Sequence, residues 1–480
     1  MIAKTRRVIG CAVAMALASA LDVAAQPNDQ TVFYQQDGLT LKWHLQAGLY
    51  LAFENDVFWD LAATTAPGTN FDADKRWQET YIKPGLSFQL ALDDDATVFG
   101  KISAVASYTF GTDPFDEGDN GAVTLEEAYL GFRGVLDGDV GYEFSLGARE
   151  LKLGTGMLIA NGATSGFERG TLKFGPRKAW ERSIVGRLTG QGAALTAFYL
   201  DPNELPSTDG ENELIGVDLR YDATAGGFIG GTFVHVLNSQ TPYPQAALGG
   251  FGTPVITTGA RDGTNTLGGY ARTGRFGGVL QNLTLTADVA YQWNDRIDLR
   301  AWAGRVQAIY AFPDLPLTPS LTVGYQTFSG DDPRTTALER FDPLYFEGSP
   351  TAWATGTKSA STFINSNVNA LVAAIQLKPS AQDTLTFRYA HIRANELRSP
   401  VQFGQATRLD ITGPTSNVVS GVTDAHLADD FFLEYNRIIT PNIFFTAGLA
   451  ISLPGQGIKD VSGGSAPNWP GGFMNIVVNF

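Results

Sequence analysis

Basic side chains crowd into one stretch of an otherwise acidic chain, residues 149–187. The stretch holds eight bases: Arg149, Lys152, Arg169, Lys173, Arg177, Lys178, Arg182 and Arg187. Only Glu150, Glu168 and Glu181 oppose them, so the local net charge is +5 in a chain whose total is −15. Fixed cations gathered in this way raise the local concentration of anions and need no covalent chemistry to act.

Residues 153–182 within this stretch show no strand pattern, so we expect a long loop. If the surrounding strands form a barrel around a pore, a loop of this length commonly folds into the pore. Its bases would then set selectivity for anions. The alternative is an extracellular loop that binds lipopolysaccharide phosphates. We predict a selectivity set of six bases: Arg149, Lys152, Arg177, Arg182, Arg187 and Arg305. Weaker candidates on polar strand faces are Lys42, Lys83, Arg133, Arg220 and Arg388.

The four histidines outline no catalytic or metal site. His44, His235, His391 and His426 lack a zinc spacing such as HExxH. His235 or His391 could serve a hydrolase on an outer barrel wall, but no motif surrounds either. The acidic cluster at 113–119 is interpreted as a solvated loop rather than a calcium site. We therefore predict no enzyme activity, no metal and no cofactor, and the acidic total excludes nucleic acid as a partner.

The elements that must position these bases are strands with strict alternation. Apolar residues from Leu39 to Leu49 occupy every second position, with Lys42 and His44 between them. The last ten residues alternate in the same way and end on Phe480. A final aromatic strand is typical of outer-membrane barrels, where it pairs with the first strand so that no open edge remains in lipid. We expect the barrel-assembly machinery to recognise it.

This alternation repeats about eighteen times between residues 39 and 480. The connections mostly alternate between long and short, so long loops gather on one side and short turns on the other. A soluble β-sandwich has no reason to sort its connections in this way. The predicted fold is therefore all-β: a transmembrane antiparallel up-and-down β-barrel of about eighteen strands, wide enough to enclose a hydrated channel.

The N-terminus has the pattern of a secretory signal. Lys4, Arg6 and Arg7 precede an apolar run that ends at small residues before Gln26. We expect a signal peptide at 1–25, a periplasmic linker at 26–38 and the barrel at 39–480. Loss of the signal moves the net charge from −15 to −17 and removes the single cysteine, so neither disulfides nor thiolate metal sites are expected. No later segment approaches the 18 apolar residues of a spanning helix.

Several segments resemble the alginate-export family of outer-membrane porins. These are residues 294–333 (NDRIDLRAWAGRVQAIYAFPDLPLTPSLTVGYQTFSGDDP), 341–346 (FDPLYF), 147–156 (GARELKLGTG) and 434–455. The resemblance implies an eighteen-stranded barrel in the outer membrane of a Gram-negative bacterium. It also implies an arginine-rich, anion-selective lumen that passes negatively charged polysaccharide.

The favoured hypothesis is a passive channel for anionic polysaccharide or small anionic solutes, with an arginine- and lysine-lined lumen. Its expected partners are outer-membrane lipid, lipopolysaccharide and the transported anion. The alternative is a general nutrient or sugar porin without anion selectivity, in which the acidic total dominates. An outer-membrane hydrolase is the third hypothesis.

Overall fold

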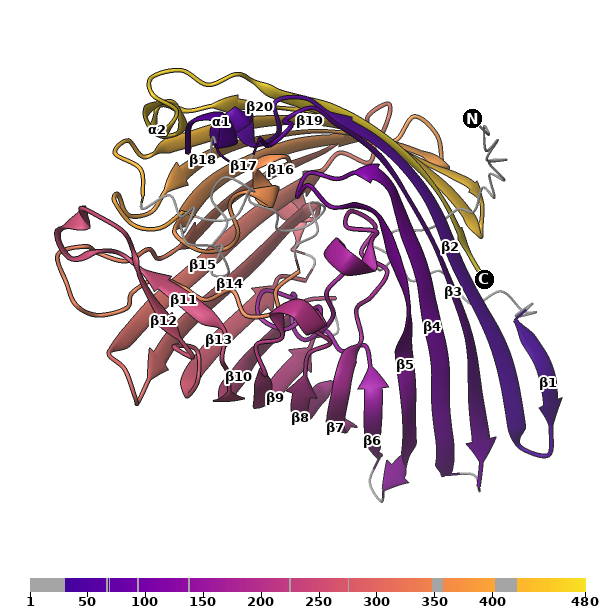
Figure 1. The fold of residues 1–480 in the computed structure, drawn as a ribbon. Coiled ribbons are helices and arrows are strands. Elements are labelled where there is room, and N and C mark those ends of the chain that lie inside the picture. Colours follow the sequence, from indigo (N-terminus) through magenta and orange to yellow (C-terminus); the bar gives the residue numbers. More distant parts are fainter. Residues whose placement is uncertain are drawn as a thin grey trace, which may run out of the picture.

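The computed structural model describes residues 31–65, 68, 70–92, 95–136, 139–223, 226–274, 276–347, 357–401 and 421–480. Within these residues, eighteen antiparallel strands close into one barrel (Figure 1), as predicted. The barrel strands are β2 (Leu39–Glu54), β3 (Lys75–Ala91), β4 (Ala96–Thr112), β5 (Gly118–Leu136), β6 (Val140–Arg149), β7 (Trp180–Gly190), β8 (Ala193–Asp201), β9 (Glu213–Asp222), β10 (Phe228–Asn238), β13 (Thr264–Arg272), β14 (Leu283–Asn294), β15 (Leu299–Ala311), β16 (Ser320–Phe328), β17 (Val368–Leu377), β18 (Asp383–Ala394), β19 (His426–Thr440), β20 (Ile443–Pro454) and β21 (Trp469–Asn479). The expected signal peptide lies outside the described residues.

Short elements decorate the barrel. A separate two-stranded sheet joins β11 (Pro242–Gln245) to β12 (Val255–Thr258). The helical turns are η1 (Val57–Asp60), α1 (Leu61–Thr65), η3 (Phe167–Arg169), η4 (Pro206–Thr208), η5 (Leu248–Gly250), η6 (Gly278–Leu280), η7 (Ser359–Ser361) and α2 (Gln456–Val461). Among the described residues, no helix has the length and apolar character needed to cross a membrane.

The barrel closes between its last and first strands. β21 pairs with β2 from Asn479 opposite Gln46 to Gly471 opposite Glu54. The first residues of β2, before Gln46, have no partner in β21. There β1 (Val32–Gln36) pairs with Leu39–Lys42 of β2. The segment expected to be a linker therefore contains a strand, because the exposed edge of β2 needs hydrogen-bond partners.

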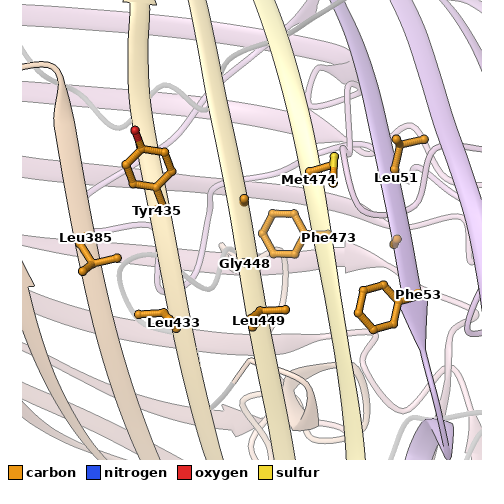
Figure 2. Close-up of a pocket in the computed structure, with 11 residues that line it drawn as sticks. Leu51, Phe53, Leu385, Leu433, Tyr435, Gly448, Leu449, Phe473 and Met474 are labelled. Carbon is orange, nitrogen blue, oxygen red and sulfur yellow. The ribbon is translucent and has the colours of Figure 1, made fainter.

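Alternation along the strands separates an apolar outer face from a polar lumen. On the outer face near the seam, Phe53, Leu433, Leu449 and Met474 are about half exposed (Figure 2). They border a shallow hollow of about 400 Å³, lined almost wholly by apolar side chains. On the lumen face of the same strands lie residues such as Gln46 and Asn475. The period-2 pattern of the sequence thus assigned these faces correctly.

Long connections gather at one end of the barrel and fold over and into it (Figure 1). The longest connections are 55–74, 150–179, 202–212, 239–263, 329–367, 395–425 and 455–468, of which 55–74, 329–367 and 395–425 include residues outside the described part. Their apolar side chains join lumen-facing strand residues in a shared hydrophobic core, which includes Trp59, Ile159, Trp180, Phe341 and Phe363. The half of the lumen at the end where the long connections gather is therefore packed by loops, while the other half is lined mainly by strand side chains.

Candidate functional site

The connection from β6 to β7, residues 150–179, crosses the lumen. On one side, Phe174 packs edge-on against Tyr50 and Tyr81, with ring centroids 5.6 and 5.2 Å away. On the opposite side, the Thr155 hydroxyl donates to the Asp288 carboxylate on β14. The basic stretch is thus an inward loop, as the favoured hypothesis expected.

Two wall carboxylates hold this loop through its backbone. Glu79 on β3 accepts N–H bonds from Lys173 and Phe174, each at 3.0 Å. Glu126 on β5 accepts N–H bonds from Lys178 at 2.8 Å and Ala179 at 3.2 Å. Both carboxylates are almost fully buried, so their charge is stabilised by these donors and, for Glu126, by Lys83.

A β-bulge in β5 orients the Glu126 side chain toward the inward loop 150–179. The pairing of β4 with β5 shifts between Ser103 opposite Glu127 and Ala104 opposite Leu125, which leaves Glu126 as the extra residue. Glu126 and Glu127 are both buried on the lumen side, although neighbours in a regular strand point to opposite faces. Glu127 is neutralised by Lys101, with 2.6 Å between Nζ and Oε2.

A third wall carboxylate holds a second inward segment. Asp430 on β19 accepts bonds from the Thr357 N–H at 2.8 Å and from the Ser359 N–H and hydroxyl at 3.1 and 2.7 Å. Beside it, Lys358 forms an ion pair with Glu54 of β2 at 2.9 Å. Burial outweighs the attraction of Glu54 and lowers the pKa of Lys358. The same arrangement, a buried carboxylate beneath backbone N–H groups, thus recurs across the lumen.

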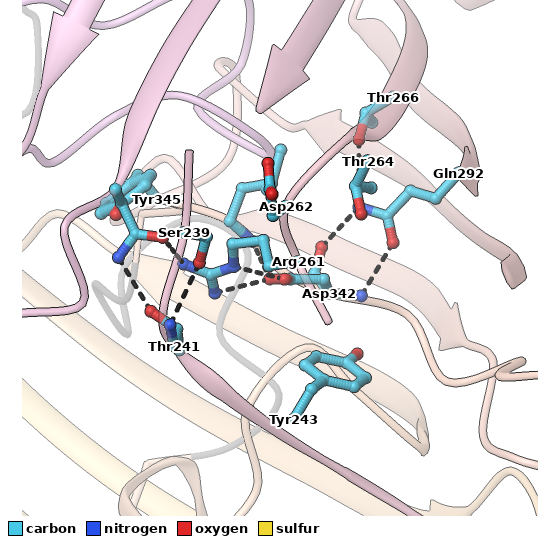
Figure 3. Close-up of polar contacts among 12 residues, drawn as sticks. Ser239, Thr241, Tyr243, Arg261, Asp262, Thr264, Thr266, Gln292, Asp342 and Tyr345 are labelled. Carbon is cyan, nitrogen blue, oxygen red and sulfur yellow. Dashed lines mark hydrogen bonds and ion pairs between the residues drawn. The ribbon is translucent and has the colours of Figure 1, made fainter. Parts of the chain in front are cut away.

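A buried ion pair joins two further loops (Figure 3). Arg261, just before β13, donates to both carboxylate oxygens of Asp342 at 2.6 and 2.9 Å. Burial disfavours the Arg261 cation, but the Asp342 charge outweighs this and the pKa of Arg261 is raised. The backbone N–H of Asp342 also donates to Gln292 of β14 at 2.8 Å, so the pair connects both loops to the wall.

A cavity of about 400 Å³ lies between the inward loop and the wall made by β2, β3 and β19–β21. Its aromatic lining includes Tyr50, Tyr81, Phe174 and Phe473. Its charged lining is mixed: Lys83, Lys173, Lys178 and Lys358 face Glu54, Glu150 and Glu434. The rings pack against one another, and Tyr50 and Tyr81 are almost fully buried.

Three bases of the predicted selectivity set are neutralised by carboxylates. Arg149 pairs with Glu143 at 2.7 Å, and Lys152 pairs with Glu347. Arg305 is buried beneath the loop at 3.1 Å from Asp288. All three lie inside the barrel, but none offers an uncompensated positive charge to the lumen.

Arg177 has no exposed surface and acts as a structural cross-link. Its guanidinium donates to Thr124 at 2.7 Å, to Ser107 at 3.0 Å and to the Ala122 carbonyl at 3.2 Å. Burial lowers its pKa to about 10, so the group remains charged at neutral pH. Its bonds to β4 and β5 hold the loop against the wall.

The prediction that Arg182 lines the lumen is wrong. β7 begins at Trp180, so Arg182 already belongs to the strand and shares a face with the exposed Ile184 and Leu188. Arg182 pairs on the outer surface with Asp201 of β8 at 2.5 Å. The sequence pattern ended the loop at residue 182, so the predicted strand began three residues later than β7 and left Arg182 out of it.

Arg187 is exposed on the lumen face and, unlike Lys152, forms no ion pair among the described residues. It lies opposite Glu143 and Thr196 in the strand register, and no ion pair involves it in the described part of the chain. Lys178, on the inward loop beside the cavity, is also exposed and lacks an ion pair among the described residues. Lys178 belongs to the basic stretch but not to the predicted selectivity set.

The weaker candidates face the lumen as predicted. They are Lys42, Lys83, Arg133, Arg220 and Arg388. Lys83 is compensated by Glu126 and Glu150, and Arg220 is compensated by Asp222. The lumen is therefore mixed in sign, with most charges paired.

Comparisons with known proteins give one family. The model of the family described as alginate export matches residues 70–421. No curated protein sequence matches the chain. Among solved structures, a chain titled outer-membrane expressed OmpT of Vibrio cholerae aligns with a TM-score of 0.39 at 10% sequence identity, covering 93% of this chain and 99% of that one.

Proposed function

Because the chain belongs to the alginate-export family, we propose that its lumen passes anionic polysaccharide or small anionic solutes by facilitated diffusion. The protein is an outer-membrane β-barrel channel of a Gram-negative bacterium. The observation that supports an anionic solute is the placement of Lys178 and Arg187. Both are exposed inside the barrel, and neither has an ion pair among the described residues.

The proposed mechanism is passage over successive shallow sites. Paired charges along the wall keep the lumen hydrated, while unpaired cations offer an anion weak, replaceable partners. Lys178 lines the cavity and presents its ammonium group there as one such site. No bond is made or broken, so we propose that the protein is not an enzyme.

The alternative remains a general nutrient porin without anion selectivity. The observation that favours it is the neutralisation of Arg149, Lys152 and Arg305 by nearby carboxylates. A lumen of balanced charge would discriminate little between a neutral sugar and a uronate.

The two functions are separated by reversal potentials in planar bilayers under a salt gradient. We expect the wild type to prefer anions. In Arg187→Gln and in Lys178→Gln, the ratio of anion to cation permeability should fall roughly several-fold. Arg182→Gln is the matched control, because it removes the same charge five residues away on the outer face of the same strand. Cation preference in the wild type, or equal effects of Arg187→Gln and Arg182→Gln, would contradict the proposal.

Substrate class is tested by current block. Oligouronates added to one side should interrupt the current, and neutral oligosaccharides of the same length should not. Equal block by both would favour the general porin.

A further inference from the structure

Two histidines and an aspartate meet on the outer face of the barrel, at the extracellular ends of β18 and β19. His391 lies opposite Asp429 in the register, and a bulge after Ile392 brings His426 beside them. On the same strands, Ala390, Ile392, Ala428 and Asp430 are buried on the lumen side. The three residues therefore face outward, next to the connection 395–425.

The donor atoms of this cluster converge. The His391 Nδ1 lies 2.8 Å from one carboxylate oxygen of Asp429, and the His426 Nε2 lies 2.9 Å from the other. The two imidazole rings are 4.8 Å apart between centroids. One ligand atom from each residue can be chosen so that all three lie within 4.8 Å of one another.

Neighbouring side chains on β18 and β19 orient the carboxylate of the cluster. The Tyr389 hydroxyl donates to the Asp429 carboxylate at 2.7 Å and so fixes its orientation. Phe431 packs against Tyr389 with 5.1 Å between ring centroids. Hydrogen bonds of this kind orient a metal ligand and tune its affinity. The side chains of His391 and His426 are each 30% exposed, so an ion can reach them from solvent.

We propose that His391, His426 and Asp429 form a binding site for a divalent transition-metal ion such as Zn²⁺. Two imidazoles and one carboxylate match the donors that zinc, nickel and copper prefer, whereas Mg²⁺ and Ca²⁺ take oxygen ligands. Tetrahedral zinc with bonds of about 2.0–2.2 Å requires donors about 3.4 Å apart. The three donors now lie within 4.8 Å of one another, so the proposed site requires side-chain rotations that bring them to that separation.

The bound ion would join two neighbouring strands at the base of a long connection and keep at least one coordination position open to solvent. The spacing of His391, His426 and Asp429 in the sequence matches no metal motif, so the sequence alone gives no sign of this site. The site depends on strand register and on the bulge, which only the folded barrel supplies.

The test uses the mature full-length protein, folded in detergent, stripped with a chelator and titrated with Zn²⁺ by calorimetry. We expect one equivalent to bind, with no comparable binding of Mg²⁺. His391→Gln and His426→Gln should each weaken binding by about tenfold or more. His235→Gln is the matched control: His235 bonds only to Asn265 at 2.9 Å and has no carboxylate bonded to it in the described part of the chain.

A second measurement does not depend on the variants. Electron paramagnetic resonance of the wild-type protein with one equivalent of Cu²⁺ should show two nitrogen ligands. Absence of Zn²⁺ binding, unchanged binding in both His391→Gln and His426→Gln, or an equal loss in His235→Gln would overturn the site. A copper signal without nitrogen coupling would overturn it as well.

Discussion

The carboxylate of Glu79 on the barrel wall accepts the backbone N–H of Lys173 through both of its oxygens, each at 3.0 Å. This contact joins residues 94 positions apart and holds the basic loop across the lumen. Because a buried carboxylate without donors is costly, the loop and the wall stabilise each other.

Removal of this contact should widen the channel. In Glu79→Ala, the N–H groups of Lys173 and Phe174 lose their acceptor, at a cost of about 1–3 kcal/mol to the docked loop. We expect a higher and noisier single-channel conductance in planar bilayers. Glu434→Gln, which removes a lumen charge that does not bond to the loop, should leave the noise unchanged. Identical traces for Glu79→Ala and the wild type would contradict the role of this contact.

Arg177→Met should loosen the loop without changing the sign of ion selectivity. The substitution removes three hydrogen bonds to β4 and β5 but no charge exposed to the lumen. We expect faster proteolysis within 150–179 and a reversal potential close to that of the wild type. A change of selectivity as large as that in Arg187→Gln would assign Arg177 to the permeation path instead.

The Arg261–Asp342 pair should show strong coupling. Each single variant, Arg261→Met or Asp342→Leu, leaves one buried charge without its partner and should cost roughly 3–5 kcal/mol of local stability. The double variant should cost less than the sum of the two. Hydrogen exchange of residues 239–263 measures the local opening. Additive effects would show that the two side chains act independently.

The turn at residues 113–117 should become less stable as pH rises. Burial raises the pKa of Asp113 to about 6, above its value in the unfolded chain. The folded turn therefore binds the proton more tightly, and its stability declines between about pH 4 and 6 by at most about 3 kcal/mol.

Hydrogen exchange of this turn, corrected for the intrinsic pH dependence, measures that slope. Asp113→Asn should abolish it, because the amide oxygen can still accept the N–H bonds of Phe115 and Glu117 without carrying charge. Asp116→Asn should retain it. A slope that persists in Asp113→Asn would assign the effect to another group.

The sequence by itself determined which side chains face lipid and which face the lumen. The alternation from Leu39 to Leu49 and in the last ten residues is a local property with a period of two, so it survives any arrangement of the barrel. The sorting of long and short connections likewise depends only on chain order, which is why the strand number and the inward basic loop could be predicted.

Tertiary structure alone decided which basic side chains are paired with carboxylates and which remain available to a solute. Lys152 pairs with Glu347, and Arg305 pairs with Asp288. The closed barrel, rather than sequence spacing, brings these partners together. A bulge turns Glu126 toward the loop, and another brings His426 to His391. Arg182 was expected in the inward loop, but β7 begins at Trp180, and the pairing of Arg182 with Asp201 of the neighbouring strand places it on the outer face.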